Sequence, residues 1–195
     1  MSDNEELPSN DFEVLDFGVE TDGVNLHAGQ TIGDYNLIQE IGRGGMGCIY
    51  LAQHQSLDRL VAIKFLSKNL TQDPAYVDLF LREAKAAAKL NHPGIVAIHD
   101  AGCTEFGDYF IVMEFIDGQN LQSLLAKRGS LTIPEAVDYT KQAAAALGYA
   151  HKHMIIHRDV KPENLLLTKN GQIKVCDLGL AKRTGESGSI TQEGL

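Results

Sequence analysis

Short runs and alternations of apolar residues in the first half of the chain predict β-strands. Two β-prone segments cover 35–41 and 48–54, and a glycine cluster separates them. A third run, 60–66 (LVAIKFL), is apolar throughout except for one lysine. We expect these three segments to form an antiparallel meander, extended by two further strands over 95–99 and 109–115.

Helical periodicity marks the segment after the third strand. Asp73 is a suitable N-cap and Pro74 a suitable first helical residue. The helix should end before His92, because the following proline disfavours helical geometry there. Apolar residues then recur at helical spacing, which predicts a buried face of Val77, Phe80, Ala84 and Ala87.

The second half of the chain is mainly helical. A short helix is expected from residue 121 to before Gly129, and Thr132 with Glu135 forms a capping box for a longer helix that ends near residue 151. Short β-like segments follow at 165–167 and 173–175. The candidate core positions of the long helix are Val137, Ala144, Leu147 and Ala150.

Length and composition fit a cytoplasmic globular protein. The chain has 195 residues, 44% of them hydrophobic, which suffices for one or two folded units. No apolar stretch approaches the roughly 20 residues that span a bilayer, and no secretory signal begins the chain. Three scattered cysteines make neither a disulfide framework nor a metal-ligand pattern.

The negative charge belongs to the first part of the chain. Residues 1–42 hold ten of the 26 acidic residues and none of the 17 Lys and Arg residues. We interpret 1–32 as a disordered acidic leader; the alternative is a docking segment, because Phe12, Val14, Leu15 and Phe17 interrupt the acids. The rest of the chain has no basic stripe of the kind that binds nucleic acid.

A Gly-x-Gly-x-x-Gly pattern lies at Gly42, Gly44 and Gly47. Glycines allow backbone N–H groups to approach phosphates closely. A dinucleotide-binding fingerprint would need a helix after the motif, whereas β-prone residues follow here. The alternatives are a phosphate-binding hairpin and an ordinary flexible turn.

A lysine interrupts the third predicted strand in Val61-Ala62-Ile63-Lys64. A lone lysine in a strand normally faces solvent. Glu83, however, lies on or beside the apolar face of the predicted helix. We therefore expect Lys64 and Glu83 to pair across the interface between helix and sheet.

The most specific pattern is the segment 157–164, His-Arg-Asp-Val-Lys-Pro-Glu-Asn. It resembles the catalytic loop of protein kinases, and Asp177-Leu178-Gly179 resembles the metal-binding Asp-Phe-Gly motif with leucine for phenylalanine. Together with the glycine motif and Lys64 these patterns follow the family's order. The chain is thus similar to the bacterial, Hanks-type serine/threonine protein kinases.

This resemblance implies an α+β, protein-kinase-like bilobal fold. The small lobe, 33–117, would hold a five-stranded antiparallel sheet and one helix. The segment 118–195 would begin a mainly helical large lobe and leave it incomplete, since the sequence stops inside the activation segment. We therefore expect this chain by itself to bind ATP weakly or not at all and to phosphorylate little, and we expect an apolar face left uncovered on the long helix.

The resemblance also implies roles for site residues in ATP-dependent transfer of phosphate to protein serine and threonine hydroxyls. The glycines would cover the phosphates, and Lys64, oriented by Glu83, would contact them. Asp159 would accept the hydroxyl proton and Lys161 would steady the γ-phosphate. Asn164 and Asp177 would bind Mg²⁺ or Mn²⁺.

The adenine would lie in an apolar pocket between the lobes. Its expected lining is Ile41, Ile49, Ala62, Leu166 and, at the back, Met113, with the backbones of Glu114 and Ile116 bonding the adenine edge.

Regulation would centre on Arg158, whose guanidinium suits a phosphate in the activation loop. The hydroxyls available there are Thr184, Ser187, Ser189 and Thr191. Cys176, beside the metal-binding aspartate, is interpreted as a small buried hydrophobe rather than a reactive thiol.

Two other functions stay open from sequence. One is an inactive kinase fragment that serves as a nucleotide-binding or interaction module; no catalytic position is substituted, which argues against it. The other is a small-molecule phosphotransferase of similar fold, against which the continuation Lys161-Pro162-Glu163-Asn164 argues.

Overall fold

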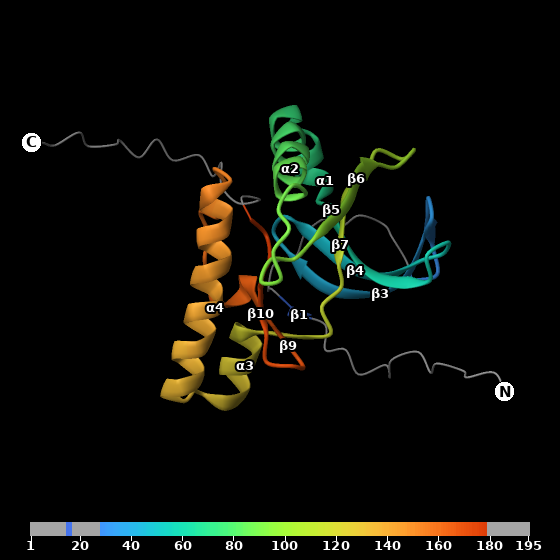
Figure 1. Ribbon diagram of the computed structural model, residues 1–195. Coiled ribbons are helices and arrows are strands. Elements are labelled where there is room, and N and C mark those ends of the chain that lie inside the picture. The colour runs from blue at the N-terminus through green and yellow to red at the C-terminus, as the bar shows by residue number, and fades with distance from the viewer. Residues whose placement is uncertain (1–14, 17–27, 179–195) are drawn as a thin grey trace, which may run out of the picture.

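The computed structural model describes residues 28–178 and the backbone of residues 15–16. Two sheets and their helices make up this part of the chain (Figure 1). Several predictions concern residues outside it: Phe12, Val14, Phe17, Gly179, Thr184, Ser187, Ser189 and Thr191.

The larger sheet has seven strands over the described residues. Its main path runs β1-β3-β4-β5-β7-β6, and β2 pairs with β3. All neighbours are antiparallel except β1 and β3, which are parallel. The strands are β1 (Leu15–Asp16), β2 (Thr31–Ile32), β3 (Tyr35–Gly44), β4 (Gly47–His54), β5 (Arg59–Leu66), β6 (Ile98–Cys103) and β7 (Tyr109–Glu114).

β5 explains why the run 60–66 is apolar on both faces. Val61, Ile63 and Phe65 are fully buried in one core cluster. Ala62 and Leu66 alternate with them and pack in a second cluster beneath helix α2. Both faces of this central strand are therefore covered, and Lys64 lies on the α2 side.

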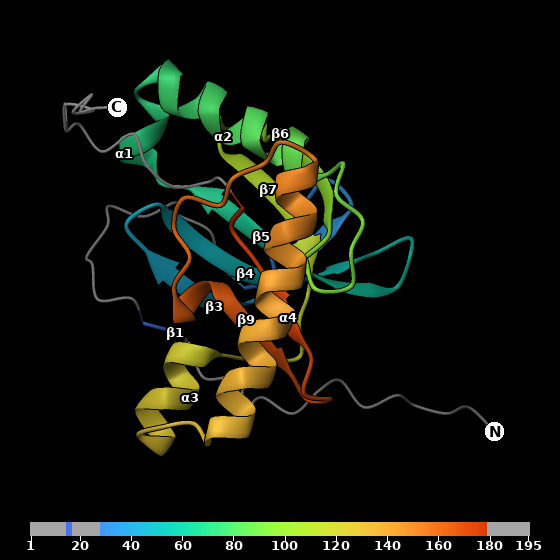
Figure 2. The same ribbon diagram turned by 60° about the vertical axis from the view of Figure 1, so that its left-hand side comes forward.

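α2 (Pro74–Ala87) crosses one face of the large sheet (Figure 2). Its N-cap is confirmed, since the Asp73 side chain accepts a bond from Ala75 N at 2.9 Å. The predicted buried face is also confirmed in full. A short helix that the sequence pattern did not predict, α1 (Lys68–Thr71), precedes α2.

The second part of the fold pairs helices with a small sheet of order β10-β9-β8. Its elements are β8 (Gly118–Asn120), α3 (Leu121–Arg128), α4 (Ile133–Lys152), the 3₁₀ turn η1 (Pro162–Asn164), β9 (Leu165–Thr168) and β10 (Ile173–Val175). None of the helices in the described ranges is long and apolar enough to cross a bilayer.

α4 begins at the predicted capping box, in which Thr132 and Glu135 each bond the other's backbone. The predicted core face was partly wrong. Val137 is 49% exposed and Ala144 is exposed, whereas Ala143, Ala146 and Ala150 are buried. A run of four alanines gives no contrast between the faces of a helix, so the sequence does not indicate which of these alanines face the core.

One strand is displaced from its prediction. We expected 95–99, but β6 begins at Ile98, which pairs with Met113 of β7. Ile95 instead forms an isolated parallel bridge with Val175 of β10, in which Val96 N donates to Val175 O and Gly94 O accepts from Val175 N. The apolar character of Ile95 and Val96 therefore reflects burial at the junction between the two parts of the fold.

That junction has an apolar cluster and an ion pair. The cluster joins the end of α2, the Ile95 loop, α4 and β10. The ion pair connects Lys174 Nζ on β10 to the Glu114 carboxylate on β7, at 2.8 Å to each oxygen. Both fix the large sheet against the smaller one and so shape the space between them.

Candidate active site

A cleft of about 1120 Å³ lies between the large sheet and the β8–α3–β9 region. Nearly all the residues predicted for nucleotide and metal binding line it: Ile41, Gly42, Gly44, Gly47, Ile49, Ala62, Lys64, Met113, Glu114, Ile116, Asp159, Lys161, Asn164, Leu166 and Asp177. Glu83 and Arg158 do not line it.

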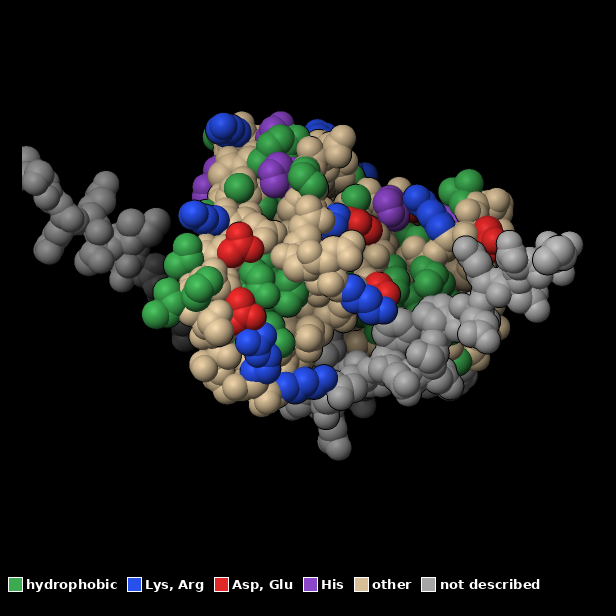
Figure 3. Space-filling model, turned by 60° about the horizontal axis from the view of Figure 1, so that its bottom comes forward, with side chains coloured by type: hydrophobic (Ala, Val, Ile, Leu, Met, Phe, Trp, Pro, Cys, Tyr) green, Lys and Arg blue, Asp and Glu red, His purple; other side chains and the backbone are tan. Residues whose placement is uncertain are grey.

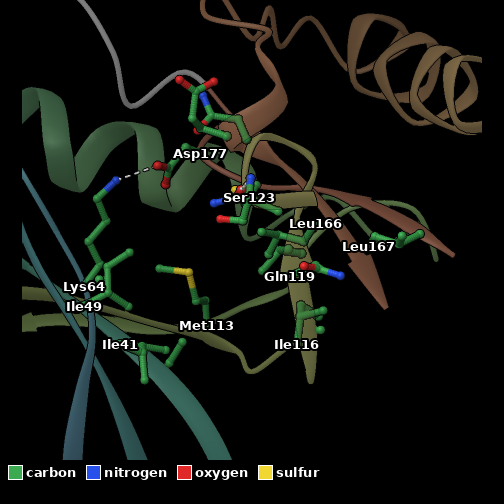
Figure 4. Close-up of a pocket in the computed structure, with 18 of the residues that line it drawn as sticks. Ile41, Ile49, Lys64, Met113, Ile116, Gln119, Ser123, Leu166, Leu167 and Asp177 are labelled. Atoms are coloured by element: carbon green, nitrogen blue, oxygen red, sulfur yellow. Dashed lines mark hydrogen bonds and ion pairs between the residues drawn. The ribbon is translucent and has the colours of Figure 1, made fainter. Parts of the chain in front are cut away.

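One end of the cleft is apolar (Figure 4). Ile41, Ile49 and Met113 approach from the large sheet, Ile116 from the connection to β8, and Leu166 from β9. These side chains come from both parts of the fold and surround an apolar space, which suits the rings of an aromatic ligand.

The glycine motif forms the tight end of the β3–β4 hairpin, where Gly44 pairs with Gly47. Gly47 has φ of 138°, and a Cβ there would lie 1.9 Å from the Phe65 carbonyl oxygen. A Cβ on Gly45 would meet no atom within 4 Å. The glycine at position 47 is therefore required by packing against β5.

Lys64 points along the cleft toward Asp177, with 2.8 Å between Nζ and Oδ2 (Figure 4). The lysine side chain is 8% exposed and the aspartate side chain 24% exposed. Pairing offsets the cost of burying the ammonium group. A lysine and a carboxylate 113 positions apart thus meet at the polar end of the cleft.

The expected pair of Lys64 with Glu83 is not formed. Glu83 lies closest to Arg158, with 3.8 Å between Oε1 and Nη1, and its Oε2 atom has no hydrogen-bond partner. Burial raises the pKa of Glu83, which Arg158 partly opposes. The helix placement of Glu83 was predictable, but its choice between two cations depends on geometry that the sequence does not specify.

The segment 157–164 is held by backbone and side-chain bonds. His157 is 1% exposed, its Nε2 lies 3.0 Å from Cys176 O, and its Nδ1 accepts from Asp159 N at 3.3 Å. A single neutral tautomer, with the proton on Nε2, satisfies both contacts. His157 therefore connects the segment carrying Asp159 to the segment carrying Asp177.

Asp159 and Lys161 face the cleft together, with 3.2 Å between Oδ2 and Nζ. Their neighbour Arg158 has a left-handed backbone, with φ of 64°. Its side chain is 58% exposed and turns away from the cleft toward Glu83.

Asn164 and Asp177 offer oxygen ligands. Asn164 is 7% exposed and its Nδ2 donates to Asp159 O at 2.9 Å, which leaves Oδ1 as the atom that it can offer to a cation. Asp177 keeps Oδ1 free of the lysine contact. Mg²⁺ takes few protein oxygens and completes its shell with phosphates and water, so this pair fits it.

Leu178 is 5% exposed and packs with Ala87, Ala150 and Val175. Its burial beneath the end of α2 anchors the chain directly after Asp177, which has φ of 56°. The leucine that stands in place of phenylalanine in this motif is thus apolar and packed.

Glu114 and Cys176 line the cleft, but neither side chain is available to bind or react with a ligand. The Glu114 carboxylate is taken by Lys174 and accepts from Ala97 N, so only its backbone remains for a ligand. Burial raises the pKa of the Cys176 thiol far above its usual range. Cys176 has intermediate exposure and is not fully buried as predicted, but a thiol that stays protonated is a weak nucleophile.

Several lining residues were not predicted. Val96, Gln119, Ser123 and Leu167 reach the cleft from loops and short elements. In Figure 4, Gln119 and Ser123 lie near Leu166, at the side of the cleft formed by β8 and α3. No spacing or composition signal marks such positions, because they depend on how the two parts of the fold meet.

Charged groups on the face seen in Figure 3 alternate in sign. This face therefore has no continuous basic stripe.

Comparison with known proteins gives the same picture. Residues 35–194 match the protein kinase domain family. The chain is 43% identical over 164 residues to the probable serine/threonine-protein kinase SCO3848 of Streptomyces coelicolor, covering 82% of this chain and 24% of that protein. It is 45% identical over 159 residues to the probable serine/threonine-protein kinase PknB of Lactococcus lactis, covering 81% and 25%.

Among solved structures, the kinase domain of Mycobacterium tuberculosis PknI superposes with a TM-score of 0.73 at 34% identity, over 80% of this chain and 62% of that one. The chain spans about a quarter of the length of the two curated relatives. The cleft between two sheets, the ordered motifs and these similarities agree: the chain belongs to the protein kinase family, of the bacterial Hanks-type serine/threonine class.

Proposed function

We propose that this chain supplies the nucleotide-binding and catalytic residues of an ATP-dependent protein serine/threonine kinase. The observation that carries the proposal is the cleft itself. The glycine hairpin, Lys64, Asp159, Asn164 and Asp177 reach it from separate elements and line one continuous space. Phosphoryl transfer relies on positioning and charge stabilisation, which such a convergence provides.

In this proposal the adenine lies at the apolar end of the cleft and the phosphates at the polar end. The backbones of Glu114 and Ile116 bond the adenine edge, and Lys64 contacts the α- and β-phosphates. A bound Mg²⁺ would neutralise phosphate charge. Asn164 and Asp177 would hold it through their oxygens.

Asp159 accepts the proton of the substrate hydroxyl, and Lys161 stabilises the γ-phosphate. The separation of 3.2 Å between their side chains supports this division of roles, because both groups face the same part of the cleft. The Asp159 backbone is fixed by His157 and Asn164, so the carboxylate is positioned before a ligand arrives.

Glu83 orients Lys64 only after it leaves Arg158. In the arrangement observed here Lys64 is held by Asp177 instead. We infer that Asp177, if it held Mg²⁺ together with the nucleotide, would no longer hold Lys64, which would then be free to pair with Glu83.

Substrates are proteins with serine or threonine hydroxyls, in line with the class of the relatives. A cytoplasmic location belongs to the same proposal, because ATP is abundant there and the three cysteines are free thiols. The acidic leader is proposed as a docking segment, and the surface on which it docks is described below.

The test is transfer of labelled γ-phosphate from ATP to a generic protein substrate. We expect label on serine and threonine, lost in Asp159→Asn and kept in Asp78→Asn, which changes an exposed aspartate on α2. Label that persists in Asp159→Asn would contradict the proposed base. A folded chain that binds MgATP but transfers nothing would support the interaction-module alternative.

A further inference from the structure

Part of the leader, Leu15–Asp16, pairs with the edge of the large sheet near the glycine motif. β1 pairs in parallel with β3, with Leu15 opposite Gly42 and Asp16 opposite Arg43. In Figures 1 and 2, β1 lies between β3 and α3. Gly42 and Arg43 also line the cleft, so this contact reaches the strand that would cover the nucleotide.

The edge of β3 is suited to such a partner. β4 covers one side of β3, and on the other side β2 pairs only with Tyr35 and Asn36. The remaining edge, toward Gly44, presents backbone N–H and C=O groups that an extended segment can bind. β1 uses this part of the edge.

Charge also favours pairing of the acidic leader with the edge of β3. The segment 1–42 holds ten acidic residues and no Lys or Arg, and Arg43 is the first basic residue. The register sets Asp16 directly beside it. Arg43 is already bonded to Glu40, with 2.7 Å between Nε and Oε1, so we expect the added attraction to be modest and the backbone pairing to set the register.

We propose that the leader strand at Leu15–Asp16 is a partner in cis for the β3 edge, and that its docking restrains the glycine hairpin and weakens nucleotide binding. A hairpin tied along one edge is less free to close over phosphates. The docked strand also adds negative charge near the site of an anionic ligand. The effect on nucleotide binding rests on the proposed function, whereas the docking of the leader strand does not.

Two residues of pairing give a contact that opens readily. If the docked form makes up about 70–90% of molecules and excludes nucleotide, the apparent affinity rises about 3- to 10-fold when docking is lost.

The test compares two double variants of the full chain. Leu15→Pro/Asp16→Pro removes both strand N–H groups, since proline has none. Ser2→Pro/Asp3→Pro adds two prolines and removes one acidic residue at a distance, so it matches the first variant in charge and composition. Hydrogen exchange at the amides of residues 42–44 reports docking without any nucleotide. MgATP titration then reports its consequence.

We expect faster exchange at 42–44 and tighter MgATP binding in Leu15→Pro/Asp16→Pro, and unchanged values in Ser2→Pro/Asp3→Pro. A synthetic peptide of residues 11–20, added to the first variant, should restore slow exchange. Equal exchange in both variants and in the unmodified chain would overturn the docking.

Faster exchange with unchanged MgATP affinity would overturn the regulatory part alone. Absence of MgATP binding in every chain would count against the proposed function and leave the exchange result to decide the docking. The three outcomes are therefore distinguishable.

Discussion

Replacing Gly47 with alanine probes why the motif contains glycine. The added Cβ would lie 1.9 Å from the Phe65 carbonyl oxygen, where contacts below 3.0 Å are essentially never found. Either β4 or β5 must move by about 1 Å, and the alanine must also adopt φ of 138°. Neither change can be absorbed by a flexible side chain, because the atom met is backbone.

The cost follows from these two terms. A non-glycine residue in a disfavoured backbone region costs about 1–3 kcal/mol, and overpacking against a central strand costs a similar amount. We expect Gly47→Ala to lower the free energy of unfolding by about 3 kcal/mol or more. For a domain of this size that corresponds to a fall in Tm of roughly 6–12 °C.

The assay is thermal and urea unfolding of the full chain, with Gly45→Ala as the matched control. Gly45 lies in the same turn and its Cβ would meet nothing within 4 Å, so its effect should stay within about 1 kcal/mol. Equal stability of the two variants would refute the packing argument. Normal stability of Gly47→Ala with loss of MgATP binding would assign this glycine to phosphate access instead.

Three further predictions concern positions outside the glycine motif. Glu83→Gln should remove a pH dependence of stability. The pKa of Glu83 is raised in the folded state, so its contribution to stability is full below the ordinary pKa of 4.5 and is lost as pH rises through the raised pKa; the variant should therefore gain stability relative to the unmodified chain as pH rises above about 4.5 in urea titrations, and a constant difference across pH would contradict this. Thr132→Ala should cost about 1 kcal/mol by removing the α4 cap, whereas Thr140→Ala, exposed within α4, should change the free energy of unfolding by less than about 0.5 kcal/mol; equal losses would contradict the capping role. Leu178→Ala should cost about 2–5 kcal/mol by opening a cavity beneath α2, while Leu57→Ala, at a site 59% exposed, should be nearly neutral in the same melts; a neutral Leu178→Ala would show that this side chain is not a packing anchor.

The sequence predicted most elements because local signals and tertiary packing agree in them. α2 and α4 begin at the residues that their caps indicate. β5 was identifiable from seven consecutive residues with one interruption. These segments have strong periodicity or capping chemistry, and the structure buries the faces of α2 and β5 that the patterns suggest.

Predictions were less accurate where the same residues are compatible with two different arrangements. Ile95 and Val96 are β-prone, but they bridge to β10 instead of starting β6. Ala144 and Ala143 are indistinguishable in a run of alanines, so the buried face of α4 could not be identified from the sequence. In both cases the deciding contact comes from a distant segment.

The site shows the same division. Its residues were identifiable because their spacing matches a known catalytic pattern, and the fold brings them to one cleft. The partner of each charge was not identifiable: Lys64 selects Asp177, and Glu83 faces Arg158. Side-chain pairing depends on distances of a few ångströms between elements, which no linear pattern encodes.

The central claim is that this cleft binds MgATP through its polar end. Calorimetric titration of the chain with ATP and Mg²⁺ tests it most directly, using Lys64→Ala and Asp177→Ala, with Lys152→Ala, at an exposed position in the last turn of α4, as the charge-matched control. The account predicts saturable, Mg²⁺-dependent binding that both cleft variants lose and the control retains. Binding that survives in Lys64→Ala and Asp177→Ala, or no binding by the folded chain, would contradict it.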